Sequence, residues 1–151
     1  MEIGSIYVLL KHETFVIAGC GRLAGIVSEA VIKGLLPEYE LVGVYSRTVA
    51  KAERIAGRMA EAGKSCAVCT TADELLALKP DILVETASPA ALREFAVPAL
   101  KNGTSIVTLS IGALADDVFT GKYAKRPRRT GHVSISLREL PEGSMSCAQQ
   151  P

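Results

Sequence analysis

The chain has 151 residues, which is room for one domain, and 48% of them are hydrophobic, enough to bury a core. Its 17 basic and 16 acidic residues nearly balance, so composition favours neither nucleic acid nor a membrane surface as a partner. No stretch approaches the roughly 20 apolar residues of a membrane span, and the first residues lack the basic segment and cleavage site of a signal peptide. We therefore expect a cytoplasmic protein, with residues 1–13 forming an N-terminal extension.

Residues 15–25 carry the most informative pattern. An apolar run of β-forming residues ends in Gly19-x-Gly21-x-x-Ala24, and an amphipathic helical pattern follows at once. This strand–turn–helix arrangement is typical of sites that hold the pyrophosphate of a dinucleotide. Gly19 would allow the tight turn, Gly21 would let the backbone approach the phosphates, and Ala24 would keep helix and strand close.

The helix that follows the turn would point its free N–H groups and the positive end of its dipole at the anion. We therefore include Arg22 and Leu23, which open this helix, in the expected cofactor site. The Arg22 side chain would lie along the pyrophosphate or point outward, and the sequence leaves both open.

Strands and helices are expected to alternate along the chain. The strands are predicted at residues 14–18, 40–45, 66–70, 81–85 and 105–110. The helices are predicted at residues 23–33, 49–62, 74–78 and 89–101, with Asp73 capping the third and Pro89 opening the fourth. This alternation predicts an α/β, Rossmann-type, doubly wound parallel sheet over residues 14–131.

The spacing of Cys66 and Cys69 matches a Cys-x-x-Cys motif. It lies in a strand-like run rather than at a helix start, where a thiol would be activated. The other cysteines and both histidines show no spacing that would complete a zinc site. We therefore expect buried, reduced thiols and no metal.

The end of the second predicted strand should choose between the two nicotinamide dinucleotides. An acid there would bind both ribose hydroxyls and repel a 2′-phosphate, but the sequence has Ser46, Arg47 and Thr48. Hydroxyl donors and a guanidinium suit a phosphate. We expect NADP in preference to NAD; alternatively, these residues only cap the next helix and point to solvent.

Further segments follow in an order that matches more than a generic nucleotide-binding domain. They are Val84-Glu-Thr-Ala-Ser88, Ala91-Leu-Arg-Glu-Phe95, Leu100-Lys-Asn-Gly103 and Ser110-Ile-Gly-Ala-Leu-Ala-Asp116. Together they resemble the amino-terminal half of the aspartate dehydrogenase family, which is grouped with homoserine dehydrogenase and dihydrodipicolinate reductase. The resemblance implies that Ala87, Ser88, Gly112 and Ala113 lie beside the ribose and nicotinamide.

The same resemblance implies an activity. The Cα hydride of an amino acid, L-aspartate in the family, would pass to nicotinamide, and the resulting imine would hydrolyse to an oxo acid and ammonia. Alternatives are a homoserine dehydrogenase-like or dihydrodipicolinate reductase-like enzyme, or a stand-alone NADP(H)-binding redox sensor. Neither His12 nor His132 matches the family's catalytic histidine, so we assign no catalytic residue.

Residues 132–151 depart from the family, whose second, substrate-binding domain is missing. A shifted codon frame over residues 134–145 permits the family's Ser-Gly-Ala motif, so we hypothesise a frameshift near Gly131. A genuine short tail with its own strand is the alternative. A frameshifted tail would be poorly ordered after residue 131 and would leave a sheet surface open to dimerisation.

The basic run at residues 122–129 suits a solvated helix end better than a nucleic-acid patch.

Overall fold

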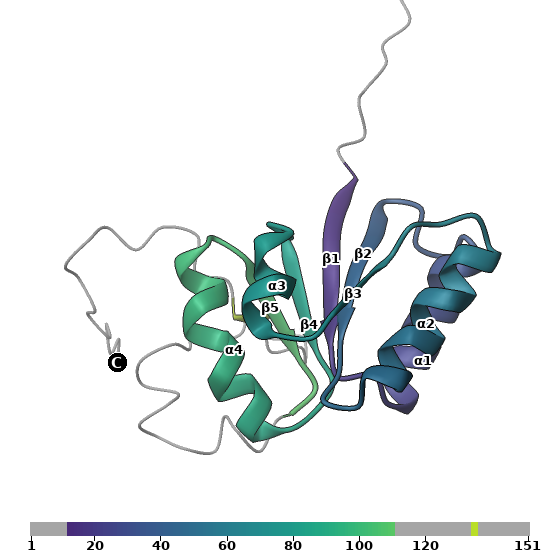
Figure 1. The fold of residues 1–151 in the computed structure, drawn as a ribbon. Coiled ribbons are helices and arrows are strands. Elements are labelled where there is room, and N and C mark those ends of the chain that lie inside the picture. The colour runs from purple at the N-terminus through teal and green to yellow at the C-terminus, as the bar shows by residue number, and fades with distance from the viewer. Residues whose placement is uncertain (1–11, 111–133, 136–151) are drawn as a thin grey trace, which may run out of the picture.

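The central strand of the sheet is β1 (Glu13–Ala18), in a computed structural model that describes residues 12–110 and 134–135 (Figure 1). It pairs in parallel with β2 (Tyr39–Tyr45) on one side and with β4 (Ile82–Glu85) on the other. The short β3 (Ala67–Cys69) extends the sheet beyond β2, and β5 (Ser105–Thr108) extends it beyond β4. All five strands are parallel, as predicted.

Two pairs of helices cover the two faces of the sheet. They are α1 (Arg22–Ile32) with α2 (Val49–Glu61), and α3 (Ala72–Ala77) with α4 (Pro89–Lys101) (Figure 1). Alternate residues of β1 point to opposite faces. Phe15 and Ile17 therefore pack in the cluster that holds the buried residues of α1 and α2, while Val16 packs with those of α3 and α4. This confirms the doubly wound α/β architecture.

The helices stop where the sequence predicted. Gly34, Gly63 and Gly103 follow the last turns of α1, α2 and α4 with φ of +70°, +74° and +75°, the left-handed conformation that ends helices. Pro89 opens α4, as expected. The cap of α3 was wrong: Thr71 is the N-cap, its Oγ accepts from the Glu74 N–H at 3.1 Å, and Asp73 lies inside the helix.

The tail contributes a two-residue strand, β6 (Ser134–Ile135), antiparallel to β5. Ile135 pairs with Ile106, and Ser134 pairs with Val107. The rest of residues 111–151 lies outside the described part of the chain, so the proposed frameshift and the order of the tail remain predictions. Within the described ranges, no helix has both the length and the apolarity needed to cross a bilayer.

Candidate functional site

The turn after β1 is held tightly against the turn that follows β4. Gly19 has φ +108°, a conformation that L side chains rarely adopt, and its N–H donates to the Tyr45 carbonyl at 2.8 Å. A Cβ added at Gly19 would come within 2.7 Å of both the N and Cβ atoms of Ala87. The Thr86 hydroxyl also donates to the Gly19 carbonyl at 2.5 Å. Glycine is therefore required here for its φ and for a close backbone approach.

Gly21 presents an open surface beside this turn. A Cβ built on it meets no atom of the described residues within 4 Å. Gly21 is also the N-cap of α1, and no side chain in the described ranges caps this helix. The first N–H groups of α1 are thus uncapped beside this open surface, at the positive end of the helix dipole, an arrangement that suits an anion.

The other predicted members of the glycine turn have different environments. Ala24 is fully buried between α1 and the sheet, where a larger side chain would push the two apart. Arg22 and Leu23 are exposed on the first turn of α1, and neither side chain lines the cleft described below.

The end of β2 supplies the polar wall. Ser46 is buried, and its Oγ accepts from the Thr48 N–H at 3.2 Å, which leaves the hydroxyl proton free to donate to another group. Arg47 and Thr48 are exposed, and Thr48 occupies the N-cap position of α2 with no side-chain cap bond among the described residues. Lys51 follows on the first turn of α2.

The turn between β4 and α4 forms the opposite wall. The Ser88 Oγ accepts from the Ala91 N–H at 3.2 Å, so this side chain caps α4 in addition to facing the cleft. Ala87 is exposed and rests against the glycine turn.

These turns enclose a cleft of about 290 Å³ at the carboxyl ends of β1, β2 and β4. Open parallel sheets bind ligands at this edge. Seven of the predicted residues line it: Gly19, Gly21, Ser46, Arg47, Thr48, Ala87 and Ser88. Gly112 and Ala113 lie outside the described residues. The prediction missed Cys20, Tyr45, Lys51, Thr86, Ala90, Ala91 and Glu94.

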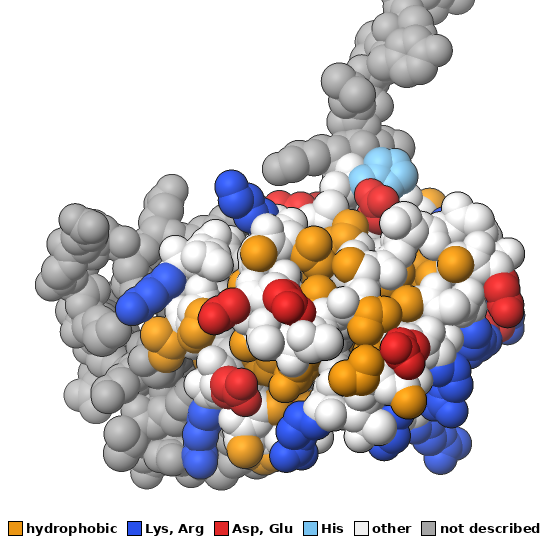
Figure 2. All heavy atoms as spheres, viewed as in Figure 1, with side chains coloured by type: hydrophobic (Ala, Val, Ile, Leu, Met, Phe, Trp, Pro, Cys, Tyr) orange, Lys and Arg blue, Asp and Glu red, His pale blue; other side chains and the backbone are white. Residues whose placement is uncertain are grey.

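Charge is distributed unevenly around the cleft. Lys51, Arg54 and Arg58 lie on α2, and Figure 2 shows Lys and Arg side chains gathered over that side of the molecule. Arg58 forms an ion pair with Glu29 of α1. Of the three α2 cations, Lys51 lines the cleft beside Arg47, whereas Glu94 of α4 adds an acid to the same lining.

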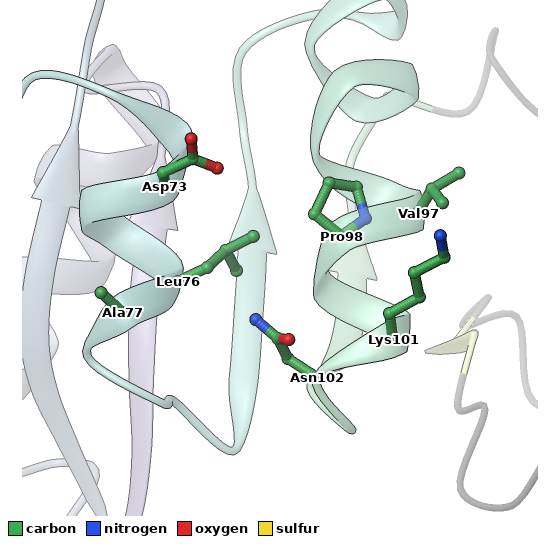
Figure 3. Close-up of a pocket in the computed structure, with 7 residues that line it drawn as sticks. All are labelled: Asp73, Leu76, Ala77, Val97, Pro98, Lys101 and Asn102. Atoms are coloured by element: carbon green, nitrogen blue, oxygen red, sulfur yellow. The ribbon is translucent and has the colours of Figure 1, made fainter.

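A second hollow of about 400 Å³ lies between α3 and α4 (Figure 3). Figure 3 shows Leu76 of α3 pointing toward α4, with Pro98 and Asn102 on the α4 side. None of the turns that follow the described strands lines this hollow. This hollow therefore lacks the strand-end turns that would hold a phosphate-bearing ligand.

The three described cysteines are free thiols. Burial raises the pKa of Cys20 to about 11, with the Lys51 charge opposing the shift, and raises that of Cys66 to about 12. Both thiols therefore stay protonated near neutral pH, which disfavours a nucleophilic role. Among the described residues, no group of three His, Cys, Asp or Glu side chains could hold a metal ion.

Known proteins resemble this chain in sequence and in fold. The family model described as the NAD-binding domain of homoserine dehydrogenase matches residues 19–135. An L-aspartate dehydrogenase of Methanococcus maripaludis is 33% identical over 71% of the chain, and L-aspartate dehydrogenase 1 of Bordetella pertussis is 32% identical over 85%. A Thermotoga maritima oxidoreductase structure superposes over 73% of the chain with a TM-score of 0.56 and 30% identity, and that match covers 32% of its own chain. The chain spans only 39% and 44% of the two named relatives.

Proposed function

The chain belongs to the family of homoserine dehydrogenase NAD-binding domains, and from this premise we propose that the cleft binds NADP(H) for hydride transfer from an amino acid. The observation that carries the proposal is the contrast between two glycines. Gly19 is packed against Ala87, whereas Gly21 faces open space beside the uncapped start of α1. A pyrophosphate fits there because the backbone can approach it without a Cβ in between.

The proposed preference for NADP rests on the end of β2. Ser46, Arg47 and Thr48 line the cleft where an acid would reject a 2′-phosphate, and Lys51 adds a second cation. When NADP(H) is bound, Arg47 and Lys51 would pair with its 2′-phosphate, and the Ser46 hydroxyl would donate to it.

The substrate that we propose is L-aspartate, the substrate named in the two dehydrogenase relatives. When bound, the cofactor supplies an acceptor for the hydride that leaves the substrate. The described residues would bind and orient the cofactor. We expect the chain alone to bind NADPH without turning over L-aspartate, because the family resemblance implies that the substrate-binding groups lie in the part of the relatives that this chain does not match.

Replacing Gly21 by Ala tests cofactor binding directly. The new Cβ meets no described atom within 4 Å, so the fold should tolerate it while the methyl group occupies the space of the pyrophosphate. We expect at least a tenfold weaker affinity for NADPH by calorimetric titration, the equivalent of about 1.4 kcal/mol.

Gly25→Ala is the matched control. It adds the same methyl group inside α1, meets no described atom within 4 Å, and lies outside the cleft lining. This variant should bind NADPH like the wild type and be slightly more stable, because Ala is the better helix former. Unchanged NADPH affinity in Gly21→Ala would contradict the proposed site.

A further inference from the structure

A fully buried carboxylate lies just beneath the cleft at the end of β4. Glu85 has no solvent exposure and accepts four hydrogen bonds. Its Oε1 accepts from the N–H groups of Ala87 at 2.7 Å and Ser88 at 2.8 Å, and from the Ser110 hydroxyl at 3.0 Å. Its Oε2 accepts from the Thr108 hydroxyl at 2.7 Å. Two backbone donors and two hydroxyls from two different strand ends thus converge on one side chain.

Burying this side chain is costly unless its oxygens are fully hydrogen-bonded. No Lys or Arg of the described ranges forms an ion pair with Glu85, so the four donors stabilise it. A carboxylate only accepts, and each of its partners is placed to donate. An apolar side chain of similar size would leave all four donors unpaired. The structure of this turn therefore depends on the acceptor oxygens of Glu85 and not only on the volume of its side chain.

The bonds of Glu85 connect the walls of the cleft without entering it. Glu85 does not line the cleft, but its partners Ala87 and Ser88 do. Ala87 in turn contacts Gly19, while Thr86 donates to the Gly19 carbonyl. The ends of β1, β4 and β5 are therefore tied together through the residue pair that forms one wall.

We propose that Glu85 is a positioning residue: it holds the Ala87–Ser88 turn, one wall of the cleft, in the position that the nicotinamide half of the cofactor requires. This inference rests on the proposed function, since it assigns a role within the same site. The proposed role of Glu85 divides the cleft into two halves. The adenosine half is held by the end of β2, which Glu85 does not contact, and the nicotinamide half depends on the turn that Glu85 holds.

The central test is Glu85→Met, which keeps a side chain of similar length but removes both acceptor oxygens. The N–H groups of Ala87 and Ser88 then lose their shared acceptor, and the turn should shift. We expect the dissociation constant for NADPH to rise about tenfold or more. Adenosine 2′,5′-bisphosphate, which contains only the adenosine half, should bind within about twofold of wild type. A merely structural role would weaken both ligands together.

Thr108→Val is the second variant, in case Glu85→Met fails to fold. It removes the hydroxyl that donates to Glu85 and that also accepts from the Ser110 N–H at 3.0 Å. Its matched control is Thr104→Val, because Thr104 is 2% exposed and donates to the Pro80 carbonyl at 2.9 Å at the other end of β5. Both variants lose a buried hydroxyl, but only Thr108→Val should weaken NADPH binding.

The outcomes separate the two proposals. If the wild-type chain binds neither ligand, the proposed function fails and this inference fails with it. If the wild type binds NADPH and the Glu85 and Thr108 variants bind it as tightly as Thr104→Val does, this inference alone is overturned. Loss of NADPH affinity with retained affinity for the bisphosphate supports it.

Discussion

Gly19→Ala is the perturbation whose effect follows most directly from the geometry. At φ +108° an alanine backbone is strained by about 1–3 kcal/mol. The new Cβ would also lie 2.7 Å from backbone and side-chain atoms of Ala87, which cannot rotate away, and overpacking of this kind costs about 1–3 kcal/mol more. The sum, about 2–6 kcal/mol, is a large fraction of the roughly 5–15 kcal/mol that stabilises a typical domain.

Gly63→Ala separates the two contributions. Gly63 has φ +74°, and no described atom lies within 4 Å of a Cβ built there, so this variant carries backbone strain without the clash. We expect it to cost about 1–2 kcal/mol. The difference between the two variants therefore estimates the cost of the clash between the added Cβ and the turn after β4, which is large only if the two turns are tightly packed.

Urea unfolding followed by circular dichroism measures both free energies. With a denaturant dependence of about 1–3 kcal/mol per molar urea, the midpoint of Gly19→Ala should fall by about 1 M or more, and further than that of Gly63→Ala. Equal midpoints for the two variants would refute the conclusion that the turns are in tight contact.

The end of β2 and the buried Cys20 thiol yield two further predictions. Arg47→Asp should weaken NADPH binding at least tenfold while NADH binding is retained or improved, because a charge-assisted hydrogen bond contributes about 1.5–3 kcal/mol. Parallel titrations with NADPH and NADH measure the two affinities. Unchanged NADPH affinity would contradict the proposed preference. The folded-state pKa of Cys20, about 11, exceeds its ordinary value of 9.0, so the folded state keeps a proton that the unfolded state releases. The contribution of this thiol to the free energy of unfolding should therefore be constant below about pH 9 and fall between about pH 9 and 11, by at most about 1.4 kcal/mol per pH unit. In Cys20→Ala the free energy of unfolding should fall less steeply over the same range. Equal slopes in the wild type and the variant would rule out this contribution.

Local patterns predicted the fold well because they act over a few residues. Alternating apolar runs located the five parallel strands, and glycines located the helix ends. The cap of α3 was misplaced because Thr71 and Asp73 are both good N-cap residue types two positions apart. Only the path of the chain after β3 decides which residue takes the extended backbone of a cap, and in the structure that residue is Thr71.

The glycine turn and the end of β2 were predictable for the same reason, but most of the remaining cleft was not. Lys51 lies one helical turn after Thr48, and this spacing is the signal that would have identified it. Glu94 lines the cleft from α4, an element separate in sequence from the glycine turn and the end of β2. In the sequence, Glu85 is only the last residue of an apolar strand, and nothing near it indicates its role. Its partners Thr108 and Ser110 reach it through the pairing of β4 with β5. Such contacts depend on tertiary structure.

The position of β1 at the middle of the sheet also dictates an order of assembly during synthesis. Its pairing with β2 and the packing of α1 and α2 involve nearby sequence, so this half can form early on the ribosome. Its pairing with β4 joins Ile17 to Val84 and must wait for that segment to leave the exit tunnel. At that point α4 has not yet been made, so the face of β1 that carries Val16 can be covered by α3 alone and is open to a chaperone or to another nascent chain. The cofactor can stabilise the newly made protein only after α4 has begun to form.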